Sequence, residues 1–253
     1  MTTTGAPGVT DLHAQVLDRL GLAIAGGEVA AGTVAYIDDL AERYAVSRSV
    51  IREALRVLSS MGMVASRRRI GTVVLPAHDW NVYDPQVIRW RLASSTRLAQ
   101  LRSITELRGA VEPAAARLAA ERATPTEASE LVGLAARMWA AGQGDDEAEF
   151  LTLDIEFHRL VLASSGNEMF LKLHELVAEV LTGRHQHGLM PHHPDAQALS
   201  LHAEVAQAVQ HRDGERARTA MASIMEQAME EMGTMWRAPQ PASRHTTQDG
   251  ATR

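Results

Sequence analysis

The first quarter of the chain carries apolar residues at helical spacing. One series recurs at every fourth position and comprises Leu12, Val16, Leu20 and Ile24. This spacing predicts an amphipathic helix over 11–25, which Gly26 and Gly27 end. Residues 1–9 show no such pattern, and we expect them to be disordered.

Two shorter helices are predicted next, over about 36–44 and 48–60, and Ser47 stands where the N-cap of the second belongs. The buried stripe of that helix consists of Val50, Ile51, Ala54, Leu55 and Leu58. Because a three-residue turn joins the two helices, they predict a helix-turn-helix. Two extended runs, 63–66 and 72–75, then flank a basic turn, which is typical of a β-wing. Residues 10–76 are therefore expected to form a winged helix-turn-helix domain.

Periodicity stops over 77–84, which predicts an interdomain linker, and everything that follows indicates helices. We expect these helices at about 85–94, 97–122, 125–141, 145–164, 167–187, 195–211 and 214–235. The short turns between them favour an antiparallel all-helical bundle over 85–236, so the fold class is mainly α. The last residues, 237–253, are polar and are expected to form a disordered tail.

Composition narrows the class of protein. No run approaches the roughly 20 apolar residues that a membrane span needs, and the first residues lack the basic and apolar pattern of a secretory signal. With no cysteine in the chain, disulfides, thiolate zinc sites and cysteine nucleophiles are excluded. These features predict a cytoplasmic protein without a membrane partner.

Positive charge is concentrated in one segment, although the net charge is −6. Seven arginines and one acid fall between residues 43 and 72. Three of the arginines recur at every fourth position of the predicted third helix, so one helix face carries Arg48, Arg52 and Arg56. Such a face suits the major groove of DNA, because a guanidinium can bond two acceptors of guanine or two phosphate oxygens.

Further DNA contacts are expected beside this face. Ser47 and Ser49 can bond phosphates. The wing is expected to contact the DNA backbone and the minor groove through Arg67, Arg68, Arg69 and its tip residue Gly71. The alternative is that both groups of arginines only solvate an exposed helix face and an exposed turn.

The segment LAERYAVSRSVIREALRVLSSMGMVASRRRIGTVV resembles the winged helix of the GntR family of bacterial regulators. The match covers about residues 11–76, and it places Arg48 and Arg52 at the arginines of the family's recognition helix. One departure concerns the start of the second helix, where Asp38 stands in place of a customary arginine. The resemblance implies double-stranded operator DNA as a partner, and the departure implies a missing contact or a different operator.

Asp154 and His158 are four residues apart in a predicted helix, so both side chains point the same way. From spacing alone, such a pair more often forms a hydrogen bond within the helix than a pair of metal ligands. The motifs LRGAVEPAAARLAA, DIEFHRLVLASSGN and LHAEVAQAVQHRDGERARTAMASI are, however, similar to the FCD effector domain of FadR-type regulators, over about residues 85–236. That resemblance implies a divalent metal, zinc or a similar ion, on Asp154, His158 and His202.

The resemblance also leaves the metal site incomplete, because its fourth ligand position is Ile224, which cannot coordinate. Either a three-ligand site remains, completed by water or effector, or the cavity works without metal. The histidines at 185, 187, 192 and 193 fall in a Gly- and Pro-containing connection. They are expected in an exposed loop, with donation of a replacement ligand as the alternative.

The resemblance to the FCD domain also implies that Arg108 points into the cavity and binds the effector, with Arg184 as a weaker candidate of the same kind. A buried guanidinium needs an anion, and a carboxylate would satisfy it with two hydrogen bonds. The alternative for Arg108 is a salt bridge to Glu106, Glu112 or another internal acid. The segment HDWNVYDPQVIRWRL and the missing last histidine are similar to galactonate-responsive members of the family, which implies a sugar acid or related carboxylate as effector.

The sequence thus predicts a ligand-responsive transcriptional regulator, with repression as the expected mode, that binds a pseudopalindromic operator as a homodimer. Two other classes remain open. A small metal-dependent enzyme would use Asp154, His158 and His202 around a catalytic ion, but no accompanying general base is recognisable, so the prediction is that the protein is not an enzyme. A DNA-binding protein with a degenerate sensor would bind its operator regardless of any metabolite.

Overall fold

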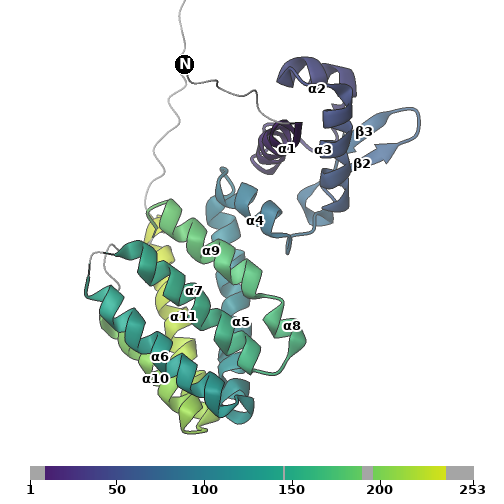
Figure 1. Ribbon diagram of the computed structural model, residues 1–253. Coiled ribbons are helices and arrows are strands. Elements are labelled where there is room, and N and C mark those ends of the chain that lie inside the picture. The colour runs from purple at the N-terminus through teal and green to yellow at the C-terminus, as the bar shows by residue number, and fades with distance from the viewer. Residues whose placement is uncertain (1–8, 145, 190–195, 238–253) are drawn as a thin grey trace, which may run out of the picture.

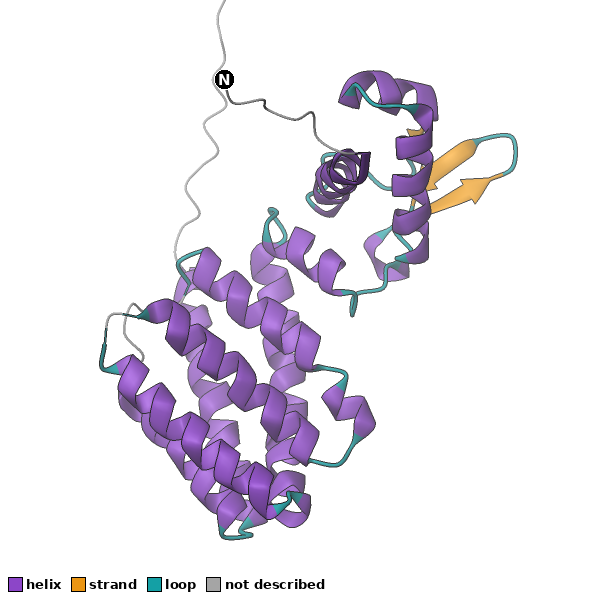
Figure 2. Ribbon diagram, in the orientation of Figure 1, coloured by secondary structure: helices purple, strands orange, loops and turns teal. Residues whose placement is uncertain are grey.

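The computed structural model describes residues 9–144, 146–189 and 196–237. The first domain contains helices α1 (Val9–Ala25), α2 (Ile37–Tyr44) and α3 (Arg48–Ser60). Its wing is formed by strands β2 (Val64–Arg67) and β3 (Gly71–Val74), to which a third strand, β1 (Val34–Ala35), is added. The mainly α fold with an N-terminal winged helix-turn-helix is confirmed (Figure 2).

The sheet has the order β1-β3-β2, and all of its pairings are antiparallel. In the wing, Val64 pairs with Val74 and Arg67 pairs with Gly71. The sequence did not predict β1, because two residues are too short to show strand alternation. Gly71 has a φ of 115°, a backbone conformation that side chains with a Cβ rarely adopt.

Ser47 caps α3 as predicted, since its hydroxyl accepts a hydrogen bond from the Val50 amide at 3.4 Å. The predicted apolar stripe of α3 is buried, and it packs against α1 and the sheet in one core. The opposite face of the helix is left to solvent. This division fixes which residues of α3 are open to a partner.

The predicted linker, residues 77–84, is tied to the first domain. It contains a short 3-10 helix, η1 (Ala77–Asp79), and the indole Nε1 of Trp80 donates to the Leu75 carbonyl at 3.0 Å. The amide of Asn81 donates to the Met61 carbonyl at 2.8 Å. The path from the wing to the next helix is therefore held by specific bonds.

The second domain is helical throughout its described residues (Figure 1). It comprises α4 (Pro85–Leu92), α5 (Arg97–Arg122), α6 (Pro125–Gly142), α7 (Glu147–Ser164), α8 (Glu168–Leu171), α9 (His174–Gln186), α10 (Ala196–Gln210) and α11 (Gly214–Arg237). The predicted bounds agree closely except over 167–187, where one helix was expected and the chain forms α8 and α9. At this break the ring nitrogen Nδ1 of His174 lies 2.7 Å from the Leu171 carbonyl, so a side chain satisfies a carbonyl that a continuous helix would bond.

Helix α4 lies between the two domains (Figure 1). Val87 and Trp90 belong to the core of the first domain, whereas Ile88 and Leu92 belong to the core of the second. The indole Nε1 of Trp90 donates to Asp18 of α1 at 3.2 Å. One short helix thus packs against both cores.

None of the described helices has the length and apolar character needed to cross a membrane.

Candidate functional site

The three predicted metal ligands meet inside the helical domain. Asp154 and His158 come from α7 and His202 from α10, and all three are buried. Their ligand atoms lie within 4.8 Å of one another. The Nε2 atoms of His158 and His202 lie 3.4 and 3.3 Å from Oδ1 of Asp154.

The other ring nitrogen of each histidine also has a close oxygen neighbour. Nδ1 of His202 lies 2.7 Å from the Ala198 carbonyl, which can only accept, so Nδ1 is the donor and Nε2 keeps the lone pair. Nδ1 of His158 lies 2.6 Å from Oε2 of Glu112. Both Nε2 atoms consequently face Asp154, as ligands of one ion must.

The contact between Glu112 and His158 was not predicted, although the sequence offered this carboxylate as a salt-bridge partner of Arg108. Glu112 is buried on α5, where Oε1 accepts from Nε of Arg108 at 2.5 Å. The available signal was the spacing of four residues between Arg108 and Glu112 within one helix. A carboxylate behind a metal-binding histidine fixes the ring and raises its basicity.

Electrostatics reflect this arrangement. Burial alone would raise the pKa of Glu112, but Arg108 and His158 lower it to about 2. Burial likewise opposes the charged form of Asp154, yet the nearby imidazoles of His158 and His202 hold its pKa well below the usual range. For His158, burial lowers the pKa, and the charge of Glu112 outweighs it and raises the pKa to about 9. The metal-free cluster therefore favours two carboxylates around one imidazolium.

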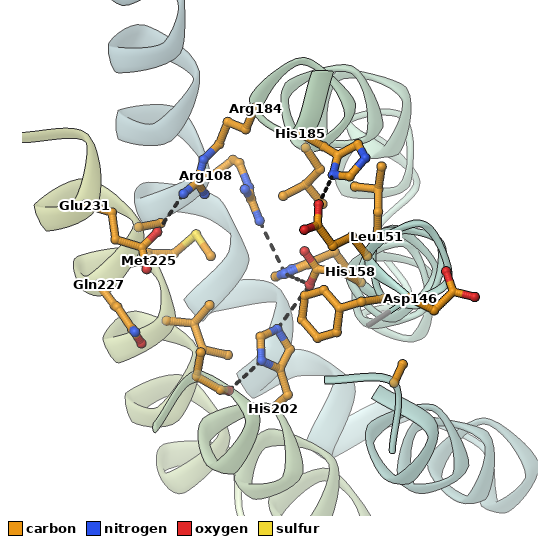
Figure 3. Close-up of a pocket in the computed structure, with 18 of the residues that line it drawn as sticks. Arg108, Asp146, Leu151, His158, Arg184, His185, His202, Met225, Gln227 and Glu231 are labelled. Atoms are coloured by element: carbon orange, nitrogen blue, oxygen red, sulfur yellow. Dashed lines mark hydrogen bonds and ion pairs between the residues drawn. The ribbon is translucent and has the colours of Figure 1, made fainter. Parts of the chain in front are cut away.

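The predicted effector residues both line the same cavity. Arg108 is paired with Glu112, the alternative that the sequence left open, and its NH2 lies 3.3 Å from Nε2 of His158. Arg184 of α9 donates to Oε2 of Glu231 of α11 at 2.6 Å (Figure 3). The Nε atom of Arg184 is buried and makes no hydrogen bond among the described residues.

Other groups complete the cavity wall. The amide oxygen of Gln227 is buried without a hydrogen-bond partner among the described residues. Ile224 also lines the cavity, 7% exposed, so the fourth ligand position presents an apolar side chain. The wall therefore combines unsatisfied polar atoms with apolar surface, which is the usual composition of a small-molecule site.

These residues fit a divalent cation held by three ligands. Oδ1 of Asp154 and Nε2 of His202 are buried and lack a hydrogen-bond partner in the described chain, which is costly unless something binds them. One carboxylate and two imidazoles form a common donor set for zinc and related ions, and three protein ligands leave a position for an exogenous oxygen.

The expectation of an exposed loop at residue 185 is wrong, because His185 lies in the last turn of α9. It lines the cavity, with Nδ1 3.9 Å from Oε2 of Glu147. His187 closes α9 at its C-cap and does not line the cavity. His192 and His193 lie outside the described residues.

The DNA-facing candidates lie together on the first domain. All are exposed: Ser47, Arg48, Ser49, Arg52 and Arg56 at α3, and Arg67, Arg68, Arg69 and Gly71 at the wing. The hydroxyls of Ser47 and Ser49 are 2.7 Å apart. Two of the arginines are paired with acids, Arg48 with Asp38 at 2.6 Å and Arg56 with Glu53 at 3.1 Å.

A winged helix-turn-helix joined to a helical domain with a polar cavity defines a DNA-binding regulator with a sensing domain. Comparison with known proteins assigns the family. The model described as bacterial regulatory proteins, gntR family, matches residues 12–74, and the FCD domain matches residues 103–227. The chain belongs to the GntR family and carries an FCD domain, and it is a DNA-binding transcriptional regulator.

Curated relatives agree with this assignment. The galactonate operon transcriptional repressor of Escherichia coli (strain K12) is 30% identical over 188 residues, which cover 74% of this chain and 81% of that protein. The HTH-type transcriptional regulator YieP of the same organism is 27% identical over 209 residues, covering 82% and 90%. The solved structure of E. coli McbR/YncC, at 20% identity and a TM-score of 0.51, covers 89% of this chain and 98% of that chain and shares the fold.

Proposed function

We propose that this regulator releases or engages its operator when a small hydroxylated carboxylate, of the sugar-acid class, binds in the cavity of the helical domain. One observation carries the proposal. The cavity holds buried polar atoms that lack partners among the described residues, and they come from α7, α9, α10 and α11. A ligand with one charged end and several hydroxyl groups would satisfy them.

The polar groups suggest how such a ligand is oriented. Asp154, His158 and His202 would hold a divalent cation, and that cation would supply an open position for a carboxylate oxygen. Arg184 and Gln227 offer a donor and an acceptor on the opposite wall for hydroxyl groups. Arg108 contributes through Glu112, to which its guanidinium donates and which lies against Nδ1 of His158. The relative with a galactonate operon supports a sugar acid as the ligand class.

A path of contacts connects the cavity to the DNA-binding domain. Helix α9 carries Arg184 on the cavity wall, and it packs so closely on α4 that a Cβ at Gly183 would meet Leu92 at 2.7 Å. Helix α4 in turn contacts α1 through Trp90. A ligand that shifts α9 would therefore shift the winged helix, provided that it binds one arrangement better than the other.

The proposal for DNA includes two copies of the chain on a pseudopalindromic operator, because two-fold operators are bound by two-fold proteins. Arg48 and Arg52, near the start of α3, would read base edges, while the wing arginines would contact phosphates. Sedimentation of the full chain with operator DNA tests this part, and a single protein of monomer mass on the DNA would contradict it.

The ligand proposal is tested by the melting temperature of the full chain against five- and six-carbon sugar acids, with neutral polyols of equal length as controls. A dose-dependent rise with an acid and not with its polyol is expected, together with a reduced rise after chelation. Arg184→Gln should reduce the response, and Arg137→Gln, on the exposed face of α6, should not. Absence of a shift with every acid would overturn the ligand class. Steady turnover of an acid by the metal-loaded protein would show that the cavity is a catalytic site and not a sensing site.

A further inference from the structure

Among the basic side chains of the proposed DNA surface, Arg48 has an unusual neighbour. Its Nε lies 2.6 Å from Oδ1 of Asp38, which belongs to the first turn of another helix, α2. The acid that pairs with Arg56, by contrast, is Glu53, three residues earlier in the same helix. A carboxylate from α2 thus reaches across to the first residue of α3.

The carboxylate must lie on the surface that meets DNA. Arg48 is the first residue of α3, and the N-terminal residues of a recognition helix are those that contact base edges. A group within hydrogen-bond distance of its guanidinium shares that surface. Phosphates repel a carboxylate there, and each uncompensated negative charge weakens the electrostatic part of DNA binding.

Folding stability does not account for the pair. The side chains of Arg48 and Asp38 are 66% and 65% exposed, and exposed ion pairs contribute little to the free energy of unfolding. Asp38 is not a capping residue either, because the N-cap of α2 is Tyr36, which makes no side-chain cap bond. What the contact does fix is the direction of the Arg48 guanidinium.

We propose that Asp38 is a specificity-determining residue that positions Arg48 and so restricts the base pair that Arg48 reads. A free arginine at this position can rotate to a guanine or to a nearby phosphate, and contact with phosphate carries no sequence information. Held by Asp38, the guanidinium keeps its remaining N–H donors in one orientation, which suits bidentate recognition of a single base edge. Asp38 lowers overall DNA affinity and raises discrimination at one position.

Asp39 provides a matched control. It follows Asp38 in the first turn of α2, is exposed and carries the same charge, and none of the ion pairs found among the described residues includes it. Replacing either acid by alanine removes one negative charge from the same helix end. Both changes should therefore raise non-specific DNA affinity at low salt by similar factors, and only Asp38→Ala should free Arg48.

The test selects bound sequences from a randomised DNA library with the full-length wild type, Arg48→Ala, Asp38→Ala and Asp39→Ala. Arg48→Ala identifies the base pair that depends on Arg48. At that pair, Asp38→Ala should reduce discrimination at least about fivefold, the equivalent of about 1 kcal/mol of one base contact. Asp39→Ala should keep the wild-type preference. Melting temperatures of all variants should match, which separates recognition from folding.

Three results would contradict the inference. Wild-type preference in Asp38→Ala at the Arg48-dependent pair would show that Arg48 needs no positioning. A loss of preference at a different base pair would show that Asp38 contacts DNA itself. An equal loss of discrimination in Asp39→Ala would show that the effect of Asp38 comes from its charge alone and not from its contact with Arg48. The inference rests on the proposed recognition face. A different result would contradict that face, namely unchanged operator binding in both Arg48→Ala and Arg52→Ala.

Discussion

Replacing Gly21 by alanine should test whether α1 and α4 are packed as closely as the structure indicates. Gly21 lies inside α1, and an alanine Cβ there would meet three atoms of the Trp90 ring at 2.5–2.6 Å. Ordinary van der Waals contact requires 3.4–4 Å, so the ring would have to move by about 1 Å. Trp90 is 5% exposed and its Nε1 donates to Asp18, which leaves little room for that movement.

Two effects of opposite sign determine the outcome. Helix propensity alone makes Gly→Ala in a helix interior stabilising by about 1 kcal/mol. Overpacking of a well-packed interface costs about 1–3 kcal/mol. Since the clash involves a bulky ring and not the end of a flexible chain, we expect the second effect to win. The free energy of unfolding should therefore fall by up to about 2 kcal/mol.

Gly133→Ala supplies the control, because Gly133 lies inside α6, is exposed, and has nothing within 4 Å of the added Cβ. Urea denaturation of both variants, followed by circular dichroism, should show stabilisation for Gly133→Ala and destabilisation for Gly21→Ala. The effect of the ligand on operator binding should also weaken in Gly21→Ala alone, because α1 would no longer pack closely against α4. Equal stabilisation of the two variants would refute the packing argument.

Three further predictions concern the buried cluster. Glu112→Gln should weaken zinc binding about 10- to 100-fold in a competition titration, because His158 loses the carboxylate behind it; unchanged affinity would exclude this role for Glu112. Ile224→His should tighten zinc binding by adding a fourth donor on the cavity wall, and no gain would place residue 224 out of reach of the ion. In chelator-treated protein the melting temperature should fall as the pH rises from 6.5 through about 9, because the raised pKa of His158 makes its imidazolium stabilising below 6.5 and lost above 9. The variant His158→Asn should lack that fall.

Much of the fold could be predicted because the spacing of apolar residues indicates most of its helices. The stripe Val50–Leu58 and the cap at Ser47 define α3 without any tertiary information. The strand β1 could not be predicted, since it exists only through pairing with β3. The division of 167–187 into two helices was hidden for a related reason: His174 replaces a backbone bond at Leu171, and no local pattern encodes that exchange.

The candidate site was only partly accessible from the sequence. Helical spacing placed Asp154 and His158 on one face, but only the packing of α10 against the bundle core brings His202 to them. The role of Glu112 depends on the distance from α5 to α7, which no spacing within one helix reveals. For Arg108, the sequence left two partners open, an effector or an internal acid. The structure shows Arg108 in contact with the internal acid Glu112, and Arg108 still lines the cavity.

Charge in the cavity would couple a metal on Asp154, His158 and His202 to the proposed ligand. Four carboxylates line the cavity among the described residues, those of Asp146, Glu147, Asp154 and Glu231, and Glu112 lies behind His158; two guanidinium groups, those of Arg108 and Arg184, accompany them. When the histidines are neutral, this set of groups is negative and opposes a carboxylate ligand. A divalent cation on Asp154, His158 and His202 offsets this negative charge beside the ligand, and a unit charge about 4 Å away is worth about 4 kcal/mol at an effective dielectric constant of 20.

Desolvation of the ligand offsets part of that gain, so we expect a sugar acid to bind at least about tenfold more weakly after chelation. Isothermal titration of the metal-loaded and metal-free protein above pH 9, where His158 is neutral, measures the difference. A neutral polyol of the same length should show no such dependence, because it carries no charge for the cation to attract. Equal affinity of the acid in both forms would mean that its carboxylate lies away from Asp154, His158 and His202, on the wall that Arg184 and Gln227 provide.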